Sequence, residues 1–110
     1  MKGPLAQLMR QAQAAQEAMQ RAQAEIAQAE MTGESGAGMV RITMNGKHQC
    51  KRVEIAPDAL KEDKEFLEDL IAAAINDVSQ RLEASAAEKM QKVAGGLNLP
   101  GGLPPGLNLG

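Results

Sequence analysis

The chain is almost without aromatic side chains: Phe66 is the only one among 110 residues. This nearly excludes binding by stacking bases on aromatic rings, and it excludes an aromatic sugar site. Cys50 is the single cysteine, so one chain forms no internal disulfide and no multi-cysteine zinc site. No apolar run approaches the roughly 20 residues that span a bilayer. The opening residues lack the apolar core of a signal peptide, and we expect a protein of the cytoplasm, a reducing compartment.

An overall basic charge is also lacking, because 12 lysines and arginines stand against 14 aspartates and glutamates. This balance counts at first sight against nucleic-acid binding. The distribution is uneven, however. Residues 58–77 contain seven acidic and two basic side chains, whereas the rest of the chain is neutral to slightly basic. A near-neutral chain can thus carry local basic surfaces.

A long first helix is predicted from Pro4 to about Glu30, since neither Gly nor Pro interrupts this segment and Ala and Gln dominate it. Apolar residues recur every seven positions in two lines, which are Leu5, Ala12, Met19 and Ile26, and Leu8, Ala15, Ala22 and Ala29. Such a repeat is typical of a coiled-coil seam. A plain amphipathic helix packed on a sheet is the alternative.

A pair of strands follows the Gly-rich segment TGESGAG at 32–38, and a further short strand is suspected at 30–34. Residues 39–44 alternate, with Val40, Ile42 and Met44 on one face. Asn45-Gly46 is a strong signal for a two-residue hairpin turn, and the return strand is expected at 48–56, before Pro57. Cys50 has the opposite parity to Val53 and Ile55. Either Cys50 faces solvent or a bulge lies near Lys51 and Arg52.

A second helix is predicted to begin with a cap at Asp58 or Asp63 and to continue to Gly95. Its apolar stripe has three- and four-residue spacing and consists of Leu67, Leu70, Ile71, Ala74, Ile75, Val78 and Leu82. Residues 95–110 contain only Gly, Leu, Pro and Asn. We expect one domain at 1–94 and a flexible tail at 95–110.

The fold class is therefore α+β, with two long helices and a small antiparallel sheet. A sheet of two or three strands is too small to cover two helices of about 40 Å. Apolar helix surface and a sheet edge would stay exposed in a monomer, so we expect an obligate homodimer. Antiparallel packing of the helices would place residues 1–16 beside residues 80–94, far from the sheet. The basic residues at that end are Lys2, Arg10, Arg81, Lys89 and Lys92.

Candidate catalytic and metal sites are weak. His48 and Cys50 share a strand face, and two copies across a dimer axis would offer four zinc ligands, but a lone pair more often has no chemical role. The acidic residues at 58–69 lack the ligand spacing of a calcium loop. The glycines at 33, 36 and 38 are not followed by GK[ST] and a helix, as a phosphate loop requires. We expect no metal, no cofactor and no enzymatic activity.

The order and spacing of several short motifs resemble the YbaB/EbfC family of bacterial nucleoid-associated proteins over essentially the full length. These motifs are LMRQAQ at 8–13, TGESGAG at 32–38 running into Val40, TMNG at 43–46, EDLIAAAIND at 68–77 and the closing Gly-Leu-Pro tail. The resemblance implies an α-β-β-β-α subunit and an intertwined, tweezer-like homodimer that binds duplex DNA and alters its shape. It also implies a place in the nucleoid and a role in nucleoid organisation, gene regulation or DNA protection.

The DNA contacts are expected at the helix ends. First-choice phosphate contacts are Lys2, Arg10, Lys89 and Lys92, followed by Arg21 and Arg81; the second-choice surface is the hairpin, with Arg41, Lys47, Lys51 and Arg52. Family members often carry several lysines on the first helix, where this chain has Gln13, Gln16, Gln20 and Gln23. We therefore expect modest, salt-sensitive affinity. The alternative function is a protein-interaction adaptor or scaffold with little affinity for DNA.

Overall fold

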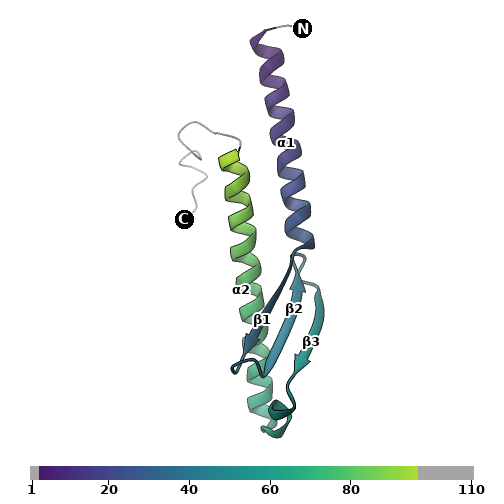
Figure 1. Cartoon of the computed structure of the whole chain (residues 1–110), viewed down its shortest axis with the longest axis vertical. Coiled ribbons are helices and arrows are strands. Elements are labelled where there is room, and N and C mark those ends of the chain that lie inside the picture. Colours follow the sequence, from purple (N-terminus) through teal and green to yellow (C-terminus); the bar gives the residue numbers. More distant parts are fainter. Residues whose placement is uncertain (1–2, 97–110) are drawn as a thin grey trace. The chain divides into compact units, whose positions relative to one another are not determined.

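The computed structural model of the chain describes residues 3–96 and has two helices and a three-stranded antiparallel sheet (Figure 1). The elements are α1 (Pro4–Gln28), β1 (Glu30–Ser35), β2 (Val40–Asn45), β3 (Cys50–Ile55), the 3₁₀ helix η1 (Pro57–Lys61) and α2 (Lys64–Gly96). The predicted α-β-β-β-α order is confirmed. The suspected third strand is β1, and α1 ends two residues before the predicted end because Glu30 already belongs to that strand.

The sheet has the strand order β1-β2-β3, so β2 is central and both neighbours are edge strands. The turn between β1 and β2 is tight: the Gly38 N–H donates to the Ser35 carbonyl at 3.1 Å. Gly36 and Ala37 both have positive φ, at 58° and 56°. Gly38 is left-handed as well, with φ of 91°, and the Met39 N–H donates to the Gly36 carbonyl at 3.2 Å, so the four residues between Ser35 and Val40 form two overlapping left-handed turns. Gly36 suits this conformation, whereas Ala37 is strained in it.

The hairpin between β2 and β3 forms as predicted, but its turn is longer than the two residues expected. The loop comprises residues 46–48 and is closed by a hydrogen bond from the Asn45 N–H to the Gln49 carbonyl at 3.1 Å. The left-handed position falls on His48, with φ of 63°, and not on Gly46. Gly46 serves another purpose, since a Cβ there would lie 2.6 Å from the Ile26 carbonyl carbon at the end of α1. Tertiary crowding, and not turn geometry, requires this glycine.

Both predictions for Cys50 are correct, since β3 has a bulge next to it and its side chain is exposed. Thr43 pairs with Arg52 and Met44 pairs with Cys50, so Lys51 is left without a partner in the strand register and forms a bulge. The bulge brings Cys50 back to the register of Val53 and Ile55. Cys50 is nevertheless exposed, because the end of β3 where it lies is uncovered.

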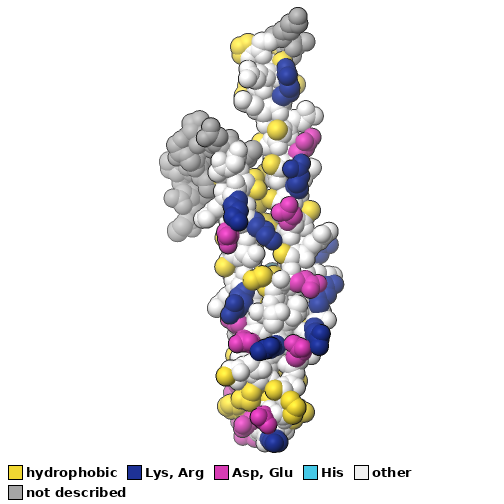
Figure 2. Space-filling view, viewed as in Figure 1, with side chains coloured by type: hydrophobic (Ala, Val, Ile, Leu, Met, Phe, Trp, Pro, Cys, Tyr) yellow, Lys and Arg dark blue, Asp and Glu magenta, His cyan; other side chains and the backbone are white. Residues whose placement is uncertain are grey.

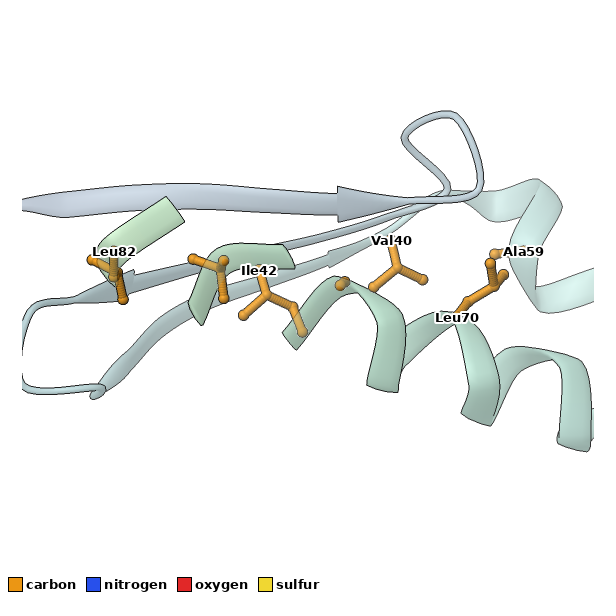
Figure 3. Close-up of a cluster of buried hydrophobic side chains, with 7 residues drawn as sticks. Val40, Ile42, Ala59, Leu70 and Leu82 are labelled. Carbon is orange, nitrogen blue, oxygen red and sulfur yellow. The ribbon is translucent and has the colours of Figure 1, made fainter. Parts of the chain in front are cut away.

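The core lies between the sheet and the first half of α2. Val40 and Ile42 of β2 are fully buried against the helix residues Leu70, Ala74 and Val78 (Figure 3). The predicted helical stripe is confirmed in its central positions, whereas Ile75 remains 40% exposed. Of the two predicted caps, Asp63 is the correct one, because its Oδ1 accepts the Phe66 N–H at 2.8 Å. Asp58 instead lies in η1.

The chain divides into two compact units. The central unit comprises residues 26–86 and contains the sheet and the core just described; the terminal unit comprises residues 1–25 and 87–110. Of the predicted tail, Gly95 and Gly96 are the last residues of α2, and 97–110 lie outside the described residues. The seven-residue repeat of α1 stays largely uncovered within the chain: Ala22 is its only buried residue, and Leu5 and Leu8 are 55% and 60% exposed.

Candidate nucleic-acid interface

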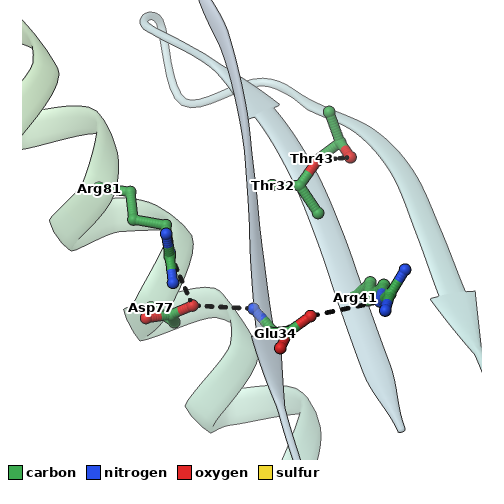
Figure 4. Close-up of polar contacts among 6 residues, drawn as sticks. All are labelled: Thr32, Glu34, Arg41, Thr43, Asp77 and Arg81. Carbon is green, nitrogen blue, oxygen red and sulfur yellow. Dashed lines mark hydrogen bonds and ion pairs between the residues drawn. The ribbon is translucent and has the colours of Figure 1, made fainter. Parts of the chain in front are cut away.

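The outer face of the sheet, opposite α2, is polar and its charges are balanced. Glu34 accepts an ion pair from Arg41 at 3.3 Å, and Arg52 pairs with Glu54 at 3.0 Å. The hydroxyls of Thr32 and Thr43 share a hydrogen bond of 2.8 Å on the same face (Figure 4). Such exposed ion pairs contribute only about 0–1 kcal/mol each to stability, but each carboxylate offsets the attraction of its arginine for an anion.

The hairpin arginines Arg41 and Arg52, both second-choice DNA contacts, are thus engaged with carboxylates. The hairpin lysines differ from them. Lys47 in the loop and Lys51 at the bulge are exposed, and in the part of the chain that the structure describes neither forms an ion pair. Of the four second-choice residues, the two lysines are thus the ones whose charge no neighbouring carboxylate offsets in the described part of the chain.

Asp77 of α2 holds the edge of the sheet and at the same time engages Arg81. Its Oδ2 accepts the backbone N–H of Glu34 at 2.9 Å and the Nε of Arg81 at 3.0 Å (Figure 4). The hydrogen bond from Glu34, followed by that from Arg81, lowers the pKa of the Asp77 carboxyl below its usual value of 3.8. Arg81 is thereby tied to the packing of α2 on β1. No sequence signal pointed to this role of Asp77, because the pairing spans 43 residues.

The terminal unit carries four of the predicted contacts within its described residues: Arg10, Arg21, Lys89 and Lys92. Arg10 and Arg21 are exposed on α1 and lie eleven residues apart. Eleven residues make about three helical turns, so both side chains share one face about 16 Å apart. On α2, Lys92 pairs with Glu88 at 3.5 Å and Lys89 is half-buried. Lys2 lies outside the described residues.

The two units differ in charge. The described part of the terminal unit has four basic and three acidic side chains, whereas the central unit has seven basic and eleven acidic ones. Over the central unit, Figure 2 shows dark blue and magenta side chains interspersed, with no continuous basic patch on the face in view. The negative electrostatic potential of the central unit therefore repels a polyanion. A polyanion binds more favourably to the terminal unit.

His48 and Cys50 are both exposed, and His48 occupies the strained position of the hairpin loop. Between residues 3 and 96, no three or more His, Cys, Asp or Glu side chains gather as ligands of a metal ion. Neither helix within the same residues has an apolar stretch long enough to cross a membrane.

Comparison with known proteins connects this arrangement to DNA. Residues 1–97 match the model of the YbaB/EbfC DNA-binding family. Among solved structures, the chain is similar to the uncharacterized protein HP0035 from Helicobacter pylori, with a TM-score of 0.60 and 22% sequence identity over 79% of this chain and 92% of that one. At this identity the likeness concerns the fold alone, whereas the family match covers all of the described residues.

Proposed function

Because the chain belongs to the YbaB/EbfC DNA-binding family, a family of nucleoid-associated proteins, we propose that it binds duplex DNA as a homodimer, largely through phosphate contacts, and alters the conformation of the DNA. It acts in the cytoplasm, at the nucleoid, in nucleoid organisation, gene regulation or DNA protection. It performs no enzymatic reaction and needs no cofactor.

The choice of the DNA contacts rests on the difference in net charge between the two units. The strongly acidic central unit repels DNA, so the contacts belong to the terminal unit: Arg10, Arg21, Lys89 and Lys92, together with Lys2. Arg81 takes a lesser part because Asp77 already engages it at 3.0 Å.

Phosphate contacts, and not contacts with bases, fit the side chains that are present. Two arginines about 16 Å apart on one helix face can reach separate phosphates of a duplex. The residues between them on this helix are mainly Ala and Gln, which offer no dense set of base-reading groups. Binding of this kind depends on salt and little on sequence.

The uncovered apolar residues of α1 support the homodimer. Leu5, Leu8 and Met19 are 42–60% exposed along one side of the helix, and water would surround them in a monomer. Burial of a large apolar side chain contributes about 1.5–3 kcal/mol, so a second copy that covers this side gains substantial stability.

The test is fluorescence anisotropy of labelled duplex DNA, titrated with the protein at several salt concentrations and with two unrelated sequences. We expect binding that weakens steeply with salt, with a log–log slope of about −0.9 per phosphate contact, and that is similar for both sequences. The double variant Lys89→Glu, Lys92→Glu is expected to bind about tenfold or more weakly while remaining dimeric.

The matched control is Lys61→Glu, Lys64→Glu, which changes the net charge equally but within the acidic segment of the central unit. Equal losses for both double variants would contradict a localised contact surface. If the unchanged protein does not bind DNA even at low salt, the proposal is wrong and the adaptor function is favoured. A deletion of residues 95–110 that removes a protein partner without affecting DNA affinity would point the same way.

A further inference from the structure

One end of the central unit is formed where β3 leads through η1 into α2. The Ala56 N–H, just after β3, donates to the Met39 carbonyl at 2.8 Å. Ala59 of η1 is fully buried in the same cluster as Leu70 of α2 (Figure 3). A Cβ on Gly36 would lie 2.8 Å from Leu70 Cδ2, so the turn between β1 and β2 also meets α2 here. These contacts fix η1 and the first turns of α2 as one surface.

Two large apolar side chains on this surface are uncovered. The buried row of α2 has one member every four residues and consists of Leu70, Ala74, Val78 and Leu82. Phe66 precedes Leu70 by four residues and continues the row by one helical turn, yet it is 43% exposed. Leu60 of η1, next to the buried Ala59, is 65% exposed. Figure 2 shows hydrophobic side chains gathered at the lower end of the view, over η1 and the start of α2. We call Leu60 and Phe66 the apolar tip.

The segment that carries the apolar tip is acidic. Residues 58–69 contain six acidic and two basic side chains, all exposed, which gives a formal net charge of −4. Lys61 pairs with Asp58 at 3.5 Å. Between residues 3 and 96, no lysine or arginine forms an ion pair with the remaining carboxylates of this segment, which are Glu62, Asp63, Glu65, Glu68 and Asp69. The apolar tip therefore has a rim whose negative charge is largely uncompensated.

Local structure explains only part of this composition. Carboxylates in the first turn of a helix interact favourably with its dipole, and this accounts for Asp63 and Glu65. No such local reason applies to Leu60 and Phe66, since water surrounds much of both side chains. An exposed apolar patch with a polar rim is typical of an interaction site, and an aromatic anchor is typical of a binding hot spot. Phe66 is the only aromatic residue of the chain.

The charge of the rim selects the class of partner. Duplex DNA and anionic membrane surfaces are repelled by it. A symmetric contact between two copies through the apolar tip would bring two equal negative surfaces together. A segment that combines Lys or Arg with one or two large apolar side chains is instead attracted by the carboxylates and buries its apolar groups on Leu60 and Phe66. We propose that the apolar tip is a docking surface for such a basic amphipathic segment of another protein.

This docking surface is separate from the proposed DNA contacts. The apolar tip and its rim belong to the central unit, whereas the DNA contacts that we propose belong to the terminal unit. The two surfaces share no residue, so the partner segment and DNA do not compete for the same side chains. The inference goes beyond the proposed function and does not depend on it.

The test uses a fluorescein-labelled synthetic peptide of about 14 residues, with Leu at helical spacing on one side and Lys on the other. Its binding to the full chain is measured by fluorescence anisotropy at low salt. We expect the protein to bind it at least about tenfold more tightly than the same peptide with every Lys replaced by Glu. We expect the same preference over a peptide with every Leu replaced by Ser.

Substitutions locate the binding surface. Phe66→Ser and Leu60→Ser are each expected to raise the dissociation constant of the basic peptide at least about tenfold. The matched control is Ile75→Ser, which replaces a residue of α2 that is 40% exposed but lies outside the apolar tip, and it is expected to change the constant less than about twofold. Circular dichroism establishes that the variants are folded. Because Leu60 and Phe66 lie on different elements, one variant still tests the surface if the other is unstable.

A second pair of variants tests the rim. Glu62→Gln combined with Glu65→Gln is expected to raise the dissociation constant of the basic peptide about threefold or more and to make its salt dependence shallower. Glu54→Gln combined with Glu83→Gln removes the same charge from exposed positions elsewhere in the central unit. This control is expected to change the constant less than about twofold.

Several results would overturn the proposal. These are no binding of the basic peptide, equal binding of the acidic peptide, or equal losses in Phe66→Ser and Ile75→Ser. A change of oligomeric state in Phe66→Ser, measured by analytical ultracentrifugation, would assign the apolar tip to a contact between copies instead. Weaker DNA binding by folded Phe66→Ser would assign it to DNA. Peptide and DNA binding are measured separately, so a failure of the unchanged protein to bind DNA overturns the proposed function and leaves this inference standing.

Discussion

Gly33 of β1 lies so close to Val78 of α2 that a Cβ built on Gly33 would come within 2.6 Å of the Val78 Cα. Backbone atoms cannot yield as the end of a flexible side chain can, so the smallest substitution forces the helix away from the sheet. This contact brings α2 down onto the sheet at the centre of the core, next to Ile42.

Replacement of this glycine is the most damaging small change that we predict. Gly33→Ala is expected to lower the free energy of unfolding by about 3 kcal/mol or more, measured by urea denaturation. Gly95→Ala is the control, because a Cβ at Gly95 meets no atom within 4 Å, and it is expected to be neutral or stabilising by up to about 1 kcal/mol. Equal stability of Gly33→Ala and the unchanged protein would show that α2 does not sit on β1 in this way.

The stabilisation from Asp77 is expected to depend on pH. Its folded-state pKa is lowered by the Glu34 N–H and by Arg81, so the ionised form stabilises the fold above the unfolded pKa of about 3.8, and this contribution is lost as the pH falls through the lower folded value. Asp77→Asn should therefore have a lower urea midpoint than the unchanged protein at pH 7, and the difference should shrink below pH 4. Asp69→Asn is the control. A difference that is constant from pH 7 to pH 3 would refute the role of the carboxylate.

The strained turn residue Ala37 offers a stabilising substitution. An L-residue in the left-handed region costs about 1–2 kcal/mol, and Gly removes most of this cost at some expense in chain entropy. Ala37→Gly is expected to raise the free energy of unfolding by about 0.5–1 kcal/mol, whereas the β-branched Ala37→Val should lower it. Thermal denaturation of the pair provides the measurement, and the reverse order of stability would contradict the left-handed conformation of Ala37.

The outer face of the sheet is expected to contribute little to DNA binding. Arg41→Ala and Arg52→Ala each remove a cation that already pairs with a carboxylate, so the dissociation constant for DNA should change less than about twofold. Arg10→Ala combined with Arg21→Ala should weaken binding and reduce the steepness of the salt dependence by about one unit for each arginine that no longer binds a phosphate. The opposite ranking, measured by anisotropy at two salt concentrations, would move the interface to the hairpin.

Much of the fold is readable from local patterns, and the exceptions have tertiary causes. The absence of Gly and Pro from residues 5–30 identifies α1, and alternation identifies β2. The hairpin signal at Asn45-Gly46 is right about the hairpin and wrong about the turn length, because Gly46 is required by the nearby end of α1. The charge of a residue also does not reveal its partners: Arg41, Arg52 and Arg81 look equally available in the sequence, yet each is engaged by a carboxylate.

By itself, the amino-acid sequence determines the order of the elements, the apolar rows of both helices and the concentration of acidic residues at 58–77, since these depend on neighbours a few positions apart. Only the tertiary structure decides that α2 covers β1 and β2 while β3 stays open, and that Asp77 reaches Glu34 across 43 residues. Those contacts join segments that are distant along the chain, and their geometry follows from how closely two backbones approach at Gly33.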